Sequence, residues 1–185
     1  GLGCRDTLRL EMKYVLYGND IDHKTNPIEA GLSWITKLNK ESFIGRESLE
    51  KYKNAQQRKL VCIEMIDKGI PRRGYEIFCD DEKVGSVTSG SQSPSLQKGI
   101  GLAYLNINKA NIDSDLDIFV RNKKLKCRVV KPPFYKNGSV LDIKDNPIKG
   151  LFACGELVGG VFFNGYPGGS GLTSGAVFGR MAGYG

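Results

Sequence analysis

The side chains that most often bind metals or form disulfides are few in this sequence and widely separated. The chain has 185 residues with a single histidine, His23, and five cysteines. No two cysteines form a C-x-x-C pair, the spacing typical of zinc and iron–sulfur sites, so we expect no metal site. We interpret the cysteines as small buried apolar residues of a protein from a reducing, cytoplasmic compartment. They are Cys4, Cys62, Cys79, Cys127 and Cys154.

A second feature that could take part in chemistry is a glycine-rich segment late in the sequence. Residues 139–185 hold 12 of the 24 glycines, with three acidic and three basic residues. Residues 1–138 hold 24 Lys and Arg against 17 Asp and Glu, and so carry the whole net charge of +7. Two compositions in one chain indicate two origins or two functions, and we place the junction near Gly138.

The positive charge suits three kinds of partner: nucleic acid, an acidic protein or a polyanionic small molecule. The sequence shows no helix-turn-helix pattern, zinc finger or RNP-type aromatic strand, so we expect no nucleic-acid partner. It also has no run of about 18 apolar residues, so we expect no membrane-spanning helix.

The periodicity of apolar residues changes along the chain and predicts the elements that would position a site. Leu8, Met12 and Val15 at helical spacing predict a helix over residues 5–17, and residues 45–55 read as a short charged helix. From Arg58 onward the period is two, which predicts strands at 59–66, 74–79, 83–90, 99–105, 116–120 and 125–130.

Six short strands within about 75 residues indicate a small antiparallel barrel or sandwich. Pro132 and Pro133 end the last strand, because proline cannot donate a hydrogen bond to a neighbouring strand. In the glycine-rich tail we expect a strand at 151–154, a loop, and a helix at about 172–183. The predicted fold class is therefore α+β.

Several long motifs resemble one known family. "GLGCRDTLRLEMKYVLYGNDID", "NPIEAGLSWITKL" and "FIGRESL" resemble the central part of glycine cleavage system T proteins. "RKLVCIEMIDKGIPRRGYEIF", "KVGSVTSGSQSPSLQKGIGLAYL" and "VVKPPFYK" resemble the C-terminal barrel of the same family. The resemblance covers residues 1–136. It implies that residues 1–56 are the C-terminal part of a folate-binding domain and that residues 57–136 are the barrel domain.

The resemblance also implies an activity. Such aminomethyltransferases move a one-carbon unit from the aminomethyl-lipoyl arm of the H protein to tetrahydrofolate and release ammonia. The family places its catalytic aspartate in an N-terminal part that has no counterpart here, and Asp6 belongs to a different motif. We therefore expect no catalytic residue in this sequence, an inactive fragment when it is alone, and an N-terminal half as a further partner beside the lipoylated H protein.

The residues that the resemblance assigns to tetrahydrofolate are Arg5, Tyr17, Trp34 and Arg73, with Ser89 as a weaker candidate. A guanidinium group binds a carboxylate such as the folate glutamate in a bidentate way, and an aromatic side chain covers a flat ring. Each has a structural alternative. Arg5 could form a local ion pair, the aromatic residues could be packing residues, and Arg73 could lie in a solvated turn.

The tail carries a second resemblance. "GELVGG" and "PGGSGLTSG" are similar to the C-terminal tail of flavoproteins of the fumarate reductase and tricarballylate dehydrogenase type. This implies that residues 137–185 are a fragment of an FAD-binding domain with Glu156, Ser170, Gly171 and Leu172 at the cofactor. We do not expect the isolated chain to bind FAD, because one segment cannot bury a cofactor that normally contacts many. A flavoprotein fragment and a non-catalytic fusion remnant stay open as alternatives.

Overall fold

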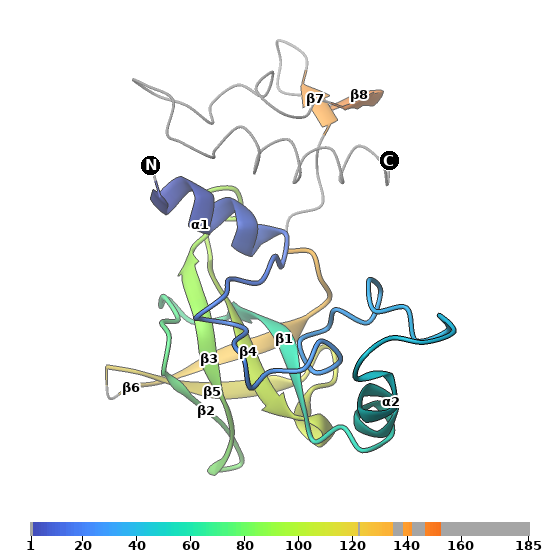
Figure 1. Cartoon of the computed structure of the whole chain (residues 1–185). Helices are drawn as coiled ribbons and strands as arrows, with labels where there is room; N and C mark the ends of the chain where they lie inside the picture. Colours follow the sequence, from blue (N-terminus) through green and yellow to red (C-terminus); the bar gives the residue numbers. More distant parts are fainter. Residues whose placement is uncertain (1, 122, 135–138, 142–146, 153–185) are drawn as a thin grey trace.

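The protein is built around a closed antiparallel β-barrel, shown in the computed structural model of Figure 1. The structure describes residues 2–121, 123–134, 139–141 and 147–152. Six strands close in the order β1-β4-β3-β2-β5-β6. They are β1 (Arg58–Met65), β2 (Glu76–Cys79), β3 (Glu82–Gln92), β4 (Gly99–Asn106), β5 (Asp115–Val120) and β6 (Lys123–Val130). This confirms the six predicted strands and selects a barrel rather than a sandwich.

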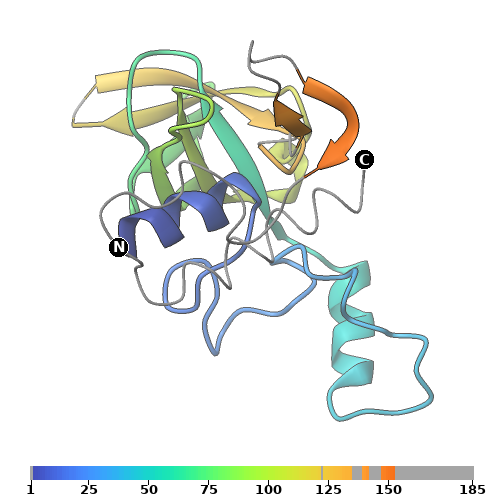
Figure 2. The same ribbon diagram turned by 90° about the horizontal axis from the view of Figure 1, so that it is seen from above.

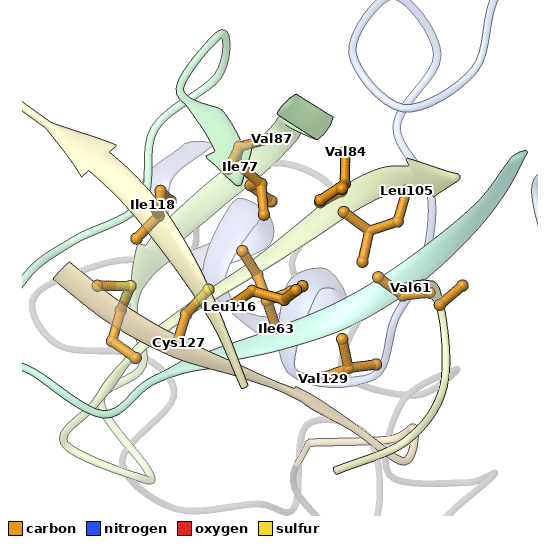
Figure 3. Close-up of a cluster of buried hydrophobic side chains, with 13 residues drawn as sticks. Val61, Ile63, Ile77, Val84, Val87, Leu105, Leu116, Ile118, Cys127 and Val129 are labelled. Atoms are coloured by element: carbon orange, nitrogen blue, oxygen red, sulfur yellow. The ribbon is translucent and has the colours of Figure 1, made fainter. Parts of the chain in front are cut away.

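The barrel interior is filled by aliphatic side chains that alternate along the strands. Val61, Ile63 and Met65 of β1 point into the first core cluster together with Leu105 of β4 and Ile118 of β5. Figure 3 shows these side chains meeting from all around the barrel. Because side chains at every second position of a strand share a face, the alternation in the sequence directs these apolar side chains into the interior.

The other face of β1 and β4 is buried as well. Leu60 of β1 and Leu102 of β4 belong to a second core cluster, in which they meet Leu10 and Phe134 from outside the barrel. Burial on both faces explains why β1 and β4 read as nearly continuous apolar runs, although the strand period is two.

The element that covers this outer face is helix α1 (Leu2–Glu11), which packs against β3 and β4. Figures 1 and 2 show it lying across one end of the barrel. The predicted helix over 5–17 is thus wrong at both ends. Lys13 has a φ of 59°, and the N–H groups of Lys13 and Tyr14 donate to the carbonyls of Leu10 and Arg9 at 2.9 and 2.7 Å. This pair of bonds is a Schellman motif, which ends the helix.

The segment between α1 and the barrel has little regular structure. The predicted charged helix is confirmed as α2 (Arg46–Asn54), but the apolar stretch over 28–38 forms a series of turns. Figure 2 shows α2 at one side of the barrel, apart from α1. A short 3₁₀ helix, η1 (Ile107–Lys109), follows β4.

After β6 the chain passes through Pro132 and Pro133, which are joined by a cis peptide bond, and the predicted end of the last strand is confirmed. β7 (Ser139–Leu141) and β8 (Pro147–Phe152) then pair antiparallel. The predicted strand at 151–154 falls partly on β8, while the helix at 172–183 lies outside the described residues. Within the described ranges, no helix is long and apolar enough to cross a membrane.

Candidate functional site

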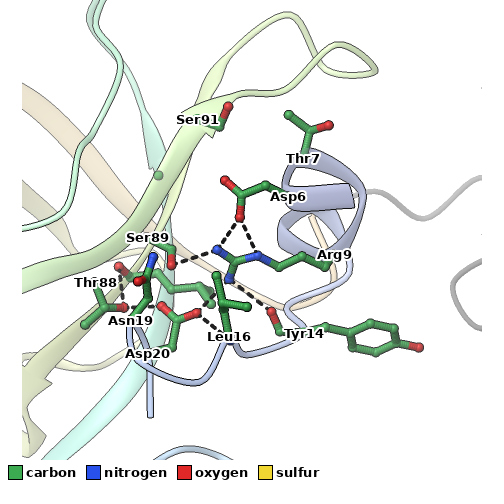
Figure 4. Close-up of polar contacts among 12 residues, drawn as sticks. Asp6, Thr7, Arg9, Tyr14, Leu16, Asn19, Asp20, Thr88, Ser89 and Ser91 are labelled. Carbon is green, nitrogen blue, oxygen red and sulfur yellow. Dashed lines mark hydrogen bonds and ion pairs between the residues drawn. The ribbon is translucent and has the colours of Figure 1, made fainter. Parts of the chain in front are cut away.

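A polar network connects α1 and the loop after it to strand β3. At its centre is Arg9, whose guanidinium group is buried. Arg9 Nη1 donates to Asp20 Oδ2 at 2.6 Å, Nη2 donates to Asp6 Oδ1 at 2.6 Å and to Ser89 Oγ at 2.9 Å. Figure 4 shows the guanidinium group between these partners. We call Asp6, Arg9, Asp20, Thr88 and Ser89 the Arg9 network.

The carboxylate of Asp20 has no solvent exposure and is fully provided with donors. Besides Arg9, the backbone N–H of Leu16 donates to Asp20 Oδ2 at 2.9 Å, and the hydroxyl of Thr88 donates to Oδ1. The Tyr104 hydroxyl donates to the Asp20 carbonyl at 3.0 Å. A buried carboxylate with three donors, one of them its counter-ion Arg9, is satisfied, so this arrangement holds the loop on the barrel and leaves the carboxylate no role in binding a ligand.

A second buried carboxylate ties the end of α1 to the β3–β4 loop. Glu11 is only 3% exposed, and it accepts hydrogen bonds from the Ser93 hydroxyl and from the Ser95 hydroxyl at 3.0 Å. The Glu11 carbonyl accepts from the N–H of Phe134 at 2.9 Å. Helix α1 is therefore anchored to the barrel at Arg9 and again at Glu11.

Burial changes the titration of the groups beneath this interface. It raises the pKa of Tyr104 to about 12, an effect to which the nearby Glu29 charge adds. Burial likewise raises the pKa of the Cys62 thiol to about 12. Neither group titrates near neutral pH, so neither suits general acid–base work there. Among the described residues there is no metal-binding cluster of His, Cys, Asp and Glu either.

Arg5, the first of the predicted folate residues, lies one helical turn before Arg9. Its side chain is exposed and forms no hydrogen bond or ion pair with any residue that the structure describes. The two arginines thus differ in what they can do. Arg9 is occupied by two carboxylates, whereas the Arg5 guanidinium group remains available to a carboxylate from outside.

Arg73 contacts the turn that contains Asn19, close to Tyr17 in the sequence. Arg73 Nη1 donates to Asn19 Oδ1 at 3.0 Å, and Asn19 is two residues beyond Tyr17 in the turn that follows α1. The Tyr17 side chain is 70% exposed. Arg73 is exposed in a turn, as its structural alternative expects, and its contact joins the loop after β1 to the N-terminal segment.

Trp34 lines a hollow of about 350 Å³ between the end of α1, the turns over 30–34 and the two prolines after β6. Met12, Tyr14 and Pro133 are also part of its wall, and the Trp34 side chain stays 59% exposed. Arg5, Tyr17 and Arg73 are not part of this wall. The weaker candidate, Ser89, is buried as an acceptor for Arg9 and faces no open space.

The predicted cofactor residues of the tail, Glu156, Ser170, Gly171 and Leu172, lie outside the described residues. Sequence reasoning missed Arg9, Asp20 and Glu11, the buried polar residues that fix the N-terminal segment. The available signal was weak. Arg9 and Glu11 flank the apolar Leu10 in α1, and a charged side chain that is buried there needs a partner of opposite charge or a hydrogen-bond partner.

Comparisons with known proteins agree with this geometry. Residues 58–136 match the "Glycine cleavage T-protein C-terminal barrel domain" and residues 1–40 match the "GCVT N-terminal domain". The chain is 49% identical over 140 residues to an aminomethyltransferase of Halalkalibacterium halodurans, and 55% identical over 139 residues to one of Bacteroides thetaiotaomicron. These alignments cover 75% and 74% of the chain but 38% of each relative, so the chain spans well under half the length of these curated relatives.

A solved structure agrees with the sequence matches. The glycine cleavage system aminomethyltransferase T from Bartonella henselae superimposes with a TM-score of 0.68 and 29% identity. The match covers 73% of the chain and 39% of the solved structure. The similarity therefore extends from the sequence to the fold.

Proposed function

Residues 1–40 and 58–136 form a fragment of a glycine cleavage T protein, and from that premise we propose that they contribute a tetrahydrofolate-binding surface to an aminomethyltransferase. The observation that carries the proposal is the identity of about half of the residues to aminomethyltransferases across the whole of this region. The reaction would transfer the aminomethyl carbon from the lipoyl arm of the H protein to tetrahydrofolate, with release of ammonia.

The exposed residues of the N-terminal segment support a binding role rather than a catalytic one. Arg5 offers an unpaired guanidinium group to the glutamate carboxylates of the folate, and Trp34 offers a half-exposed ring beside a hollow. Tyr17 and Arg73 would extend the same surface around the turn at Asn19. The resemblance assigns the catalytic aspartate to a region other than residues 1–136, so these residues would hold the substrate while another segment supplies the reacting carboxylate.

The test is a calorimetric titration of the purified chain with tetrahydrofolate. We expect saturable binding that weakens about tenfold or more in Arg5→Gln, since a charge-assisted pair is lost. Arg46→Gln is the matched control, because it removes an equal charge from the other helix and should leave the affinity unchanged. Equal affinity of Arg5→Gln and the unsubstituted chain would contradict the assignment of Arg5, and absence of binding would contradict the proposal for this chain as a whole.

Two finer assignments also remain proposals. Cys62, Cys79 and Cys127 are free thiols, which supports a reducing compartment such as the cytoplasm. The tail motifs around Glu156 and Gly171 support descent from a flavoprotein. An absorbance spectrum of the purified chain tests the tail: flavin bands would show that it still binds FAD, and their absence is the result we expect.

A further inference from the structure

A hollow at one end of the barrel is lined by cationic side chains and by no acidic one. It measures about 440 Å³ and lies between the loop that follows β1 and the β5–β6 hairpin. The loop contributes Lys68 and Arg72, and the hairpin contributes Arg121 and Lys123. All four side chains are exposed to solvent.

None of these four cations has an acidic partner within the described part of the chain. No side-chain ion pair or hydrogen bond is formed there by Lys68, Arg121 or Lys123. The Arg72 side chain makes only a long contact of 3.4 Å to the Gly90 carbonyl. Four like charges around one hollow repel one another, so an anion placed among them would gain from all four.

The cations on the neighbouring face of the β5–β6 hairpin do have acidic partners. One position further along β6, Lys124 contacts Asp117 and Asp81, and Lys126 contacts Asp117 at 2.7 Å. Arg128 binds Asp115 through both Nε and Nη2. The cations on that face of the hairpin are neutralised within the barrel, whereas those at the hollow are left for a ligand from outside.

The floor of the hollow is apolar and rigidly supported. Tyr75, Val120 and Leu125 line it, and all three pack against the first core cluster inside the barrel. The loop that follows β1 is also packed closely against β3 and β4. A Cβ atom added at Gly90 would lie 2.2 Å from the Pro71 carbonyl oxygen, and one added at Gly99 would lie 2.2 Å from that of Gly69. The hollow is therefore formed before any ligand arrives, which favours binding.

We propose that this hollow binds an organic phosphate with two or more negative charges, such as a nucleoside diphosphate. Two arginines and two lysines suit the phosphate oxygens, because a guanidinium group binds phosphate in a bidentate way and an ammonium group acts as a point charge. The apolar part of the ligand lies on Tyr75 and Leu125. A volume of about 440 Å³ falls within the range of small-molecule sites, and this favours a compact anion over a protein surface.

The experiment is a calorimetric titration of the purified 185-residue chain with ADP and, separately, with inorganic pyrophosphate at low salt. We expect saturable binding of both, with ADP bound more tightly because its base and sugar contact the floor. The double substitution Arg72→Gln and Lys123→Gln should weaken both ligands about tenfold or more. Tyr75→Leu should weaken ADP severalfold and leave pyrophosphate unchanged.

The matched control is the double substitution Lys59→Gln and Lys131→Gln, which removes the same charge from exposed positions away from the hollow. Its affinities should equal those of the unsubstituted chain. Equal losses in the two double variants would overturn the proposal, because the attraction would then depend only on net charge. Equal affinity for ADP and pyrophosphate would overturn the organic part of the assignment. A circular dichroism melt of each variant verifies that the barrel is folded.

Discussion

The inner and outer faces of β1 and β4 are both buried, but different contacts bury them. On the inner face, Val61, Ile63 and Leu105 meet only apolar side chains of other strands. On the outer face, Leu60 and Leu102 meet α1 and the residue after the prolines, next to the charged Arg9 network. The first face is closed by the barrel itself, whereas the second depends on a segment that precedes the barrel in the chain.

The difference teaches that the two faces have different sources of specificity. Apolar packing inside the barrel accepts any side chains of suitable shape and volume. The Arg9 network accepts only one placement of the N-terminal segment, because a buried guanidinium group and carboxylate must meet with good geometry. The exposed Arg5, one turn away on the same helix, is therefore positioned by a network of which it is not a member.

The largest effect should follow from Arg9→Met. This substitution leaves the Asp20 carboxylate buried without its counter-ion, and such a loss costs about 3–5 kcal/mol. Urea unfolding monitored by circular dichroism measures it. Arg46→Met, which breaks an exposed pair with Glu50 on α2, is the control and should cost at most about 1 kcal/mol. Similar values for the two would mean that the Arg9 network does not anchor the segment.

Truncation of one core residue from each face sharpens the comparison next. Leu10→Ala and Ile118→Ala each remove a fully buried side chain and should cost about 3 kcal/mol. Hydrogen exchange tells the faces apart. We expect Leu10→Ala to speed exchange in α1 while the strands stay protected, and Ile118→Ala to speed exchange in all six strands. Uniform acceleration in both variants would show that the two faces unfold as one unit.

A smaller effect is expected for a carboxylate on the barrel surface away from α1. Burial raises the pKa of Asp117, but hydrogen bonds from Lys126 and Lys124 outweigh that effect and hold the pKa below the ordinary 3.8. The ion pairs therefore stabilise the folded state above pH 4, and this contribution is lost as the pH falls through the lowered pKa. Asp117→Asn should cost at most about 1 kcal/mol at pH 7 and less at pH 2. Unfolding curves at the two pH values test this; an equal cost at both would contradict it.

The smallest effect on stability is expected in the last experiment, which measures thiol reactivity. Thiol reactivity reports directly on the burial of each cysteine. Burial raises the pKa of Cys62 and Cys127 to about 12, whereas Cys79 is half-buried. In a Cys154→Ser background at pH 8, we expect a thiol reagent to label Cys79 and to label Cys62 and Cys127 only after denaturant is added. Peptide mass mapping identifies the sites. Labelling of Cys62 without denaturant would show that α1 leaves the outer face readily.

The strands could be predicted because their signal is local. Alternation and turn residues placed all six. The end of α1 could not be predicted, because Leu8, Met12 and Val15 keep a helical spacing while the backbone already turns at Lys13. The turns over 28–38 were not predicted at all, since an apolar stretch without a clear period does not specify its backbone.

For the candidate site, the sequence by itself determined the family motifs, Arg5 as a candidate for folate and the change of composition near Gly138. Only the tertiary structure decided that Arg9, and not Arg5, is occupied by Asp6 and Asp20, and that the two buried carboxylates bind partners far away in the chain. It also brought Arg72 and Lys123 to one hollow. The physical reason is that alternation and capping act between neighbours in the chain, whereas the pairing of buried charges is decided by which distant strands and loops the closed barrel brings together.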